Sequence, residues 1–383
     1  METVEFQELL ERGEDSSTQF KKNITSADSL AADMVAFSNG AGGKILIGIN
    51  DDGSVSGLSS EDVRRINQLI SNTASQHVQP AINPVTKNIK TANGLVMLVD
   101  VPSGINKPYQ DKNGVFWVKS GADKRKATSR EEIQRIFQKA HLLHADEMLI
   151  NDLTINDFDM EYFENYFLNR FGEPLAEQKQ PVINILTNMN LLKDGFLTLS
   201  SALLFAKRPQ YKIPISIVKA GAFDSTDIAT DIYYDSRDIA GKMEDVYRQT
   251  INFIISNLHH KQNGQDFNSI GKPEIPHDSI KEIVANALIH RDYFISSHIR
   301  VFVFKDRVEI ISPGHLPNNL TVENIKLGTS HPRNALLASH ANHIIPYRGY
   351  GSGIINALSK YPHIDFIDDR EGNYFKAILK RVC

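Results

Sequence analysis

The sequence is poor in cysteine, in long apolar runs and in excess positive charge, and each shortage removes a class of protein. Its single cysteine, Cys383, cannot form an intramolecular disulfide or a cysteine-rich zinc site, which favours a reducing compartment. No apolar run approaches the roughly 18 residues of a membrane span, and the acidic segment 1–15 is unlike a signal or transit peptide. We therefore expect a cytoplasmic protein with no membrane partner.

Positive charge is also limited, because the formal net charge is −4 over 383 residues. Contacts with nucleic acid must then be local rather than spread over the whole surface. No segment matches the pattern GxxxxGK(S/T), so a P-loop helicase motor is not expected. The length is sufficient for two or three domains with substantial cores.

The segment 282–293, EIVANALIHRDY, places polar side chains at helical spacing. Glu282, Asn286 and His290 share one face of the predicted amphipathic helix, and apolar residues form the opposite face. A carboxylate beside water can take up a proton, and a hard cation that keeps most of its waters accepts one neutral oxygen ligand beside phosphates. The row predicts a metal-nucleotide site, although a solvated helix face would show the same spacing.

Two further patterns follow this helix. Residues 298–314, HIRVFVFKDRVEIISPG, alternate as two strands around a turn at 305–307, and RGYGSGI at 348–354 is a glycine cluster before an apolar helix. This order of helix, hairpin and glycine cluster resembles the nucleotide fold of the gyrase, Hsp90, histidine kinase and MutL ATPases. The order is most similar to the divergent version of this nucleotide fold that lies at the C-terminus of RecG-like proteins.

The resemblance implies a Bergerat-type α/β sandwich that binds ATP and Mg²⁺. Glu282 would be the ATPase base and Asn286 the Mg²⁺ ligand, and the other nucleotide-binding residues would be His290, Gly314, Arg348, Gly349, Gly351 and Gly353. The adenine-binding turn of that superfamily carries an Asp, whereas the equivalent turn here reads Ser312, Pro313, Gly314. Loss of a buried acceptor weakens discrimination between bases, so we expect reduced adenine selectivity. We also expect slow or absent ATP hydrolysis.

The N-terminal part carries a second family pattern. Residues 13–23 read GEDSSTQFKKN, and residues 33–57 read DMVAFSNGAGGKILIGINDDGSVSG. Together they resemble the Schlafen-like AlbA domain over roughly residues 6–138, which implies contact with DNA or RNA. In nucleolytic Schlafens two Glu and one Asp hold a metal and cut structured RNA; the matching positions are Glu14, Gln19 and Asp51. Because Gln19 is an amide, the metal site is weakened.

Basic residues gather at 119–130, KSGADKRKATSR, just after the aromatic residues Phe116 and Trp117. Basic groups beside aromatic rings offer phosphate contacts and stacking platforms, although a solvated loop can have the same composition. The predicted nucleic-acid contacts are Lys119, Lys124, Arg125, Lys126 and Arg130.

We expect an α/β (α+β) multidomain protein. Residues 1–140 form the Schlafen/AlbA-like domain, 141–210 a helical, winged-helix-like connector, and 211–383 the ATPase-like domain. The preferred function is an ATP-binding, nucleic-acid-binding regulator, of transcription for example, that forms a homo-oligomer such as a dimer. The alternatives are a metal-dependent endoribonuclease using Glu14 and Asp51, and a non-catalytic assembly module.

Overall fold

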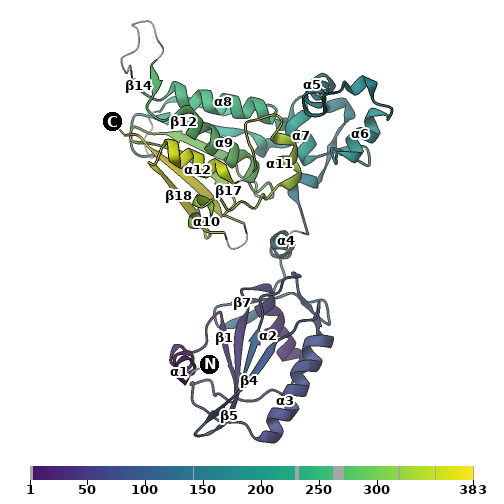
Figure 1. Cartoon of the computed structure of the whole chain (residues 1–383), viewed down its shortest axis with the longest axis vertical. Coiled ribbons are helices and arrows are strands. Elements are labelled where there is room, and N and C mark those ends of the chain that lie inside the picture. The colour runs from purple at the N-terminus through teal and green to yellow at the C-terminus, as the bar shows by residue number, and fades with distance from the viewer. Residues whose placement is uncertain are drawn as a thin grey trace. The chain divides into compact units, whose positions relative to one another are not determined.

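The computed structural model describes residues 3–140, 142–228, 233–261, 271–317, 320–349 and 351–382. The chain forms two compact units, residues 1–143 and residues 144–383 (Figure 1). Both contain helices and sheets, so the predicted mixed α/β multidomain class is confirmed. No helix among the described residues is long and apolar enough to cross a membrane. Cys383 lies outside the described residues, as does Tyr350 of the glycine cluster.

The N-terminal unit is built on a four-stranded sheet in the order β1-β2-β5-β4. Its strands are β1 (Thr18–Lys21), β2 (Gly43–Ile47), β4 (Val85–Thr91) and β5 (Gly94–Val101). Strands β1 and β2 are parallel, and the other two pairings are antiparallel. Two short pairs lie outside this sheet: β3 (Val78–Gln79) with β6 (Gln110–Asp111), and β7 (Trp117–Ser120) with β8 (Asp123–Lys126).

Helices cover both faces of this sheet (Figure 1). They are α1 (Thr3–Arg12), α2 (Ala27–Asn39) and α3 (Ser60–Asn72), and α4 (Arg130–Lys139) follows later in the chain. Helix α2 is apolar almost all round and is buried from Leu30 to Ser38, as a helix inside a core must be. It packs with α3 against one face, whereas α1 covers the other through Phe6.

The glycine turn before β2 serves packing. A Cβ on Gly43 would lie 2.2 Å from the Phe37 ring, and Gly42 has a φ of +85°. The turn therefore lets β2 lie close against α2, which is a structural reason for its glycines.

The C-terminal unit contains a six-stranded mixed sheet in the order β13-β12-β16-β17-β19-β18. Its strands are β12 (Val218–Phe223), β13 (Tyr233–Ile239), β16 (Ile299–Val303), β17 (Arg307–Pro313), β18 (Ile364–Asp369) and β19 (Tyr374–Lys380). The predicted hairpin at 298–314 is the antiparallel pair β16-β17. A short pair, β14 (His260–Lys261) with β15 (Lys272–Pro273), lies before the next helix.

Three helices pack on one face of this sheet (Figure 1). They are α8 (Met243–Ser256), α9 (His277–His290) and α12 (Ser352–Lys360). Between β17 and α12 lies a segment with two shorter helices, α10 (Val322–Lys326) and α11 (Ala335–Ala341), which we call the lid, residues 320–347. The two-layer arrangement of helices on a sheet agrees with the predicted sandwich.

Residues 144–206 pack with this sandwich in one continuous apolar core. They form the helices α5 (Met160–Phe171), α6 (Val182–Asn188) and α7 (Leu199–Phe205). They also form a three-stranded sheet in the order β10-β11-β9, from β9 (Leu149–Thr154), β10 (Leu192–Lys193) and β11 (Phe196–Thr198). The predicted connector at 141–210 thus combines helices with a small sheet and shares the compact unit of residues 144–383.

Candidate functional site

A cleft between α9, the lid and the end of β17 contains the predicted nucleotide-binding residues. Its lining includes Glu282, Asn286, His290, Gly314, Arg348, Gly349, Gly351 and Gly353. The cleft holds about 1020 Å³ of free space including its open mouth, at the upper end of the range of small-molecule sites. Residues separated by up to 71 positions, from Glu282 to Gly353, therefore meet at one site.

Helix α9 fixes the two polar groups that the sequence singled out. The Asn286 side-chain nitrogen donates to the backbone oxygen of Glu282 at 2.7 Å. This bond leaves the Asn286 Oδ1 atom available, and no described residue donates to it. Glu282 is half-buried, and burial raises the pKa of its carboxyl while Arg348 opposes that rise.

The glycine cluster brings the start of α12 against this pair. A Cβ on Gly353 would lie 2.6 Å from the Glu282 Oε2 atom. Gly351 caps α12 with a φ of +73°, and a Cβ there would lie 1.9 Å from the backbone oxygen of Gly328. The first N–H groups of α12 thus lie beside the carboxylate and amide of α9, where a helix N-terminus favours an anion.

His290 contributes a neutral ring to the cleft. Its Nε2 atom is hydrogen-bonded to the Tyr347 hydroxyl at 3.0 Å. Burial lowers the pKa of His290 to about 4, and the charge of Arg333 acts in the same direction. Within the described part of the lining, Arg348 is then the one permanent cation, and it is exposed.

The turn at 312–314, which lacks a carboxylate, lies against an ion pair between Asp292 and Arg333 that no local sequence pattern indicated. Gly314 has a φ of +98°, and a Cβ there would lie 2.6 Å from the Asp292 Cβ atom. The Asp292 carboxylate accepts from Arg333 at 2.8 Å, and Arg333 also donates to the backbone oxygen of His315. Asp292 is therefore engaged with Arg333, and it does not line the cleft.

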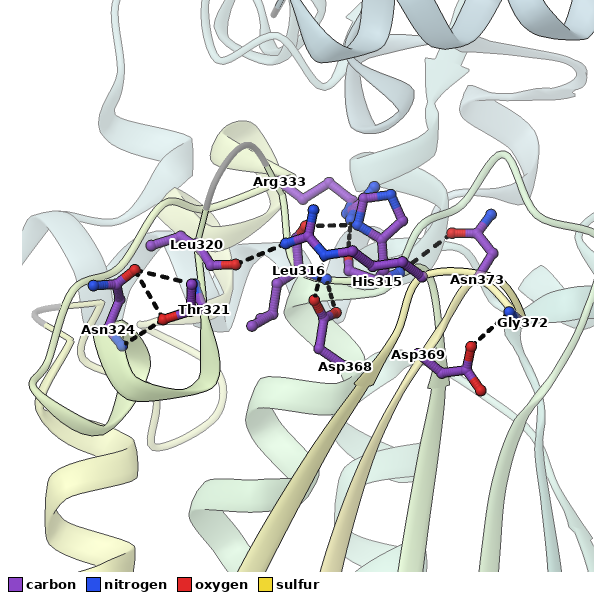
Figure 2. Close-up of polar contacts among 11 residues, drawn as sticks. His315, Leu316, Leu320, Thr321, Asn324, Arg333, Asp368, Asp369, Gly372 and Asn373 are labelled. Atoms are coloured by element: carbon purple, nitrogen blue, oxygen red, sulfur yellow. Dashed lines mark hydrogen bonds and ion pairs between the residues drawn. The ribbon is translucent and has the colours of Figure 1, made fainter. Parts of the chain in front are cut away.

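Figure 2 shows how the chain after Gly314 is anchored. The Leu316 N–H donates to the Asp368 carboxylate at 2.6 Å, and the His315 N–H donates to the side chain of Asn373 at 3.3 Å. At the start of α10, Thr321 and Asn324 form a reciprocal capping box. The first two contacts anchor the turn to β18 and to the residue before β19.

The end of the cleft near this turn is mainly apolar. Its lining there comes from strands β17 to β19, from the turn after β17 and from the lid: Ile310, Leu316, Leu320, Ile325, Phe366, Phe375 and Ala377. Ser312 lies among them, 6% exposed, and its hydroxyl donates to the Ala287 backbone oxygen at 3.0 Å. An apolar slot beside a polar, anion-binding end matches the two halves of a nucleotide.

In the N-terminal unit the structure brings together two of the three positions predicted for a metal, Glu14 and Gln19. Glu14 is half-buried and accepts from the Gln19 side chain and the Phe20 N–H, both at 2.6 Å. Asp51 is exposed in the turn after β2, and no contact between described residues joins it to Glu14. Over the described ranges, no group of three or more His, Cys, Asp or Glu is placed to hold a metal.

The predicted basic segment is largely engaged in contacts within the unit. Lys124 forms an ion pair of 2.8 Å with buried Asp33, and Arg125 forms one of 2.6 Å with Glu132. Lys119 donates to Gln19. Lys126, which lies 5.4 Å from the Trp117 ring, and Arg130 are exposed. These two cations are therefore the ones that phosphates can reach most readily.

Two family models match parts of the chain. Residues 14–128 match the family "Schlafen, AlbA_2", and residues 296–377 match the family "Putative ATP-dependent DNA helicase recG C-terminal". The second match begins after α9, so it contains the hairpin, the lid and the glycine cluster but not Glu282 and Asn286. A comparison with curated proteins finds no match.

Solved structures also resemble the chain. One is the DIP2311 protein from Corynebacterium diphtheriae, with 20% identity and a TM-score of 0.46, covering 96% of this chain and 75% of that one. Another is the N-terminal domain of a RecG-related protein from Nitrosomonas europaea, with 22% identity and a TM-score of 0.23, covering 34% of this chain and 97% of that one. The chain is thus similar to a Schlafen AlbA_2 domain over residues 14–128 and to a RecG C-terminal domain over residues 296–377.

Proposed function

We propose that the chain binds ATP with Mg²⁺ in the cleft and uses the nucleotide to control contacts of its N-terminal unit with nucleic acid. It would act as a regulator, of transcription for example, with slow or no hydrolysis. The observation that carries the proposal is the meeting of Glu282, Asn286 and the N-terminus of α12 at the polar end of one cleft. The proposal includes a homo-oligomer, which light scattering on the purified chain would test.

The residues present fit a magnesium nucleotide. Asn286 offers one neutral oxygen, as a cation that keeps several waters requires, and the carboxylate of Glu282 lies one turn before it on α9. The ion would neutralise charge on the phosphates. The first turn of α12 would bind the phosphates through its N–H groups, and the apolar end of the cleft would take the base.

Slow hydrolysis is expected from the charges around the polar end. Transfer of the terminal phosphoryl group needs several preorganised positive groups where charge develops. His290 is held neutral, and Arg333 is engaged with Asp292 away from the lining. Exposed Arg348 alone gives weaker stabilisation than a buried cation because solvent screens it.

Contacts of the lid support a regulatory role. Asn334, which directly follows Arg333, donates to the backbone oxygens of Ile289 and Arg291 at the end of α9, at 2.7 and 2.8 Å. Three residues later the Leu337 N–H donates to Asp146, and His340 hydrogen-bonds the Met189 backbone oxygen. A nucleotide that favours one lid position would therefore also act on residues 144–206, provided that its affinity differs between the two states.

Titration calorimetry with ATP and Mg²⁺ tests the proposal on the full chain. We expect the substitution Asn286→Ala to weaken binding at least about tenfold, which corresponds to about 1.4 kcal/mol, because a metal ligand is removed. The matched control is Asn356→Ala, an exposed residue on α12 outside the cleft lining. Equal affinity of wild type and Asn286→Ala would refute the assignment.

A further inference from the structure

Three side chains at the start of β1 form a continuous network in the N-terminal unit. The Gln19 side-chain nitrogen donates to the Glu14 carboxylate at 2.6 Å, and the Lys119 Nζ atom donates to the Gln19 side-chain oxygen at 3.1 Å. Gln19 is 7% exposed. Because a carboxylate accepts and an ammonium donates, the two partners fix the orientation of the amide between them.

The ammonium of Lys119 is surrounded by acceptors and acidic groups. It also donates to the backbone oxygen of Ala122 and lies 5.0 Å from the centre of the Phe37 ring. Burial lowers the pKa of Lys119, and the charges of Asp33, Glu14 and Asp123 oppose that fall. This cation is therefore held in place by side-chain, backbone and aromatic contacts together.

A divalent metal would need different chemistry at the same place. Such an ion takes oxygen ligands and is held by several negative charges. Here the side-chain nitrogen of Gln19 donates to Glu14, and the side-chain oxygen of Gln19 accepts from Lys119. A carboxylate at position 19 would repel Glu14 at this distance unless a cation lay between them, whereas the amide replaces that repulsion with a hydrogen bond.

We propose that Lys119 is the resident cation of the N-terminal unit, and that its ammonium replaces the divalent metal expected beside Glu14. The unit then holds no divalent ion at this position, and its contacts with nucleic acid do not depend on one. This inference is independent of the ATP cleft, which lies in the other unit.

A titration of Mn²⁺ into the full chain, followed by electron paramagnetic resonance without nucleotide, tests it. The carrier Asn286→Ala is used throughout so that the cleft of the other unit contributes no Mn²⁺ ligand from that residue. We expect no Mn²⁺ binding that depends on Glu14 in this background. Adding both Lys119→Met and Gln19→Glu to the carrier should raise its affinity for Mn²⁺ at least tenfold. Adding Glu14→Gln as well should abolish this gain.

Two results would overturn the proposal. One is Mn²⁺ binding by the carrier that Glu14→Gln abolishes, which needs no new site and no unstable variant. The other is a folded Lys119→Met/Gln19→Glu variant that gains no Mn²⁺ affinity. Thermal melting shows whether that variant is folded. If it is unfolded, the test is the comparison of the carrier with its Glu14→Gln form. Equal Mn²⁺ binding by these two proteins would then support the proposal.

Discussion

Single residues in the cleft have distinct physical roles, as two glycines of one cluster show. Gly351 has a φ that side chains rarely adopt, and a Cβ would meet the backbone oxygen of Gly328. Gly353 has no such constraint on φ, and its Cβ would meet the end of the Glu282 side chain. The first glycine is required for the fold of the lid and α12, and the second for the space between α12 and α9.

These roles predict different effects of an alanine substitution at the two glycines. Gly351→Ala should lower the free energy of unfolding by about 1–3 kcal/mol, because the left-handed conformation and a rigid backbone contact both penalise a Cβ. Gly353→Ala should leave stability within about 1 kcal/mol but weaken ATP binding, because it displaces Glu282. Urea unfolding and ATP titration of both variants measure this; equal destabilisation by the two would contradict it.

Helical periodicity was enough to predict that Glu282, Asn286 and His290 share one face, because that relation is local. The pairing of Arg333 with Asp292 and of His290 with Tyr347 joins positions 41 and 57 residues apart, and no local pattern reports such contacts. The basic segment was visible in composition for the same local reason. That Lys124 is engaged by Asp33 depends on how β8 packs on α2, which the sequence did not indicate.

Strand β8 and the start of α4 carry two kinds of cation. Lys124 pairs with a buried carboxylate, whereas Lys126 and Arg130 are exposed. Lys124→Met should destabilise the chain by about 3 kcal/mol, because it removes the ion-pair partner of the buried Asp33 carboxylate. Lys126→Met with Arg130→Met should change stability by less than about 1 kcal/mol, because both residues are exposed.

The same variants test contact with nucleic acid. The double variant at Lys126 and Arg130 should weaken binding of DNA or RNA and reduce its dependence on salt, because fewer phosphates are neutralised. Filter binding at several salt concentrations, in EDTA, measures both quantities. Unchanged affinity and salt dependence would show that nucleic acid does not bind at this segment.

Helix α11 of the lid contacts residues 144–206 through the buried His340. Burial lowers the pKa of His340 to about 4, and Arg170 and His343 act in the same direction. Tyr166 and the Met189 backbone oxygen hydrogen-bond its two ring nitrogens. Since the pKa of a histidine in the unfolded chain is 6.5, the unfolded state binds the proton first as pH falls.

The free energy of unfolding should therefore fall as pH decreases from 6.5 to about 4. Above pH 6.5, His340 should add nothing to its pH dependence. The loss from this residue is on the order of 3 kcal/mol. His340→Gln should remove that part of the pH dependence, while His290, whose pKa is also lowered to about 4, still contributes. Urea unfolding at pH 7 and pH 4.5 measures it; an unchanged difference between the two pH values would contradict the assignment.

For the whole molecule, the structure divides the proposed activities between two units. Residues 144–383 hold the cleft, the lid and the segment that α11 contacts, and residues 1–143 hold the network of Glu14, Gln19 and Lys119. The mixed α/β class was expected from the two family patterns, because each pattern lies within its own segment of the sequence. The sharing of one core by residues 144–206 and the sandwich depends on contacts over long distances in sequence.

A crystal structure of the full chain with a non-hydrolysable ATP analogue and Mg²⁺ would show whether the cleft binds the nucleotide. We expect the triphosphate to lie at the N-terminus of α12, the ion to bind the Asn286 Oδ1 atom and the base to occupy the apolar end of the cleft. A nucleotide bound elsewhere, or a cleft that stays empty at saturating analogue, would contradict it.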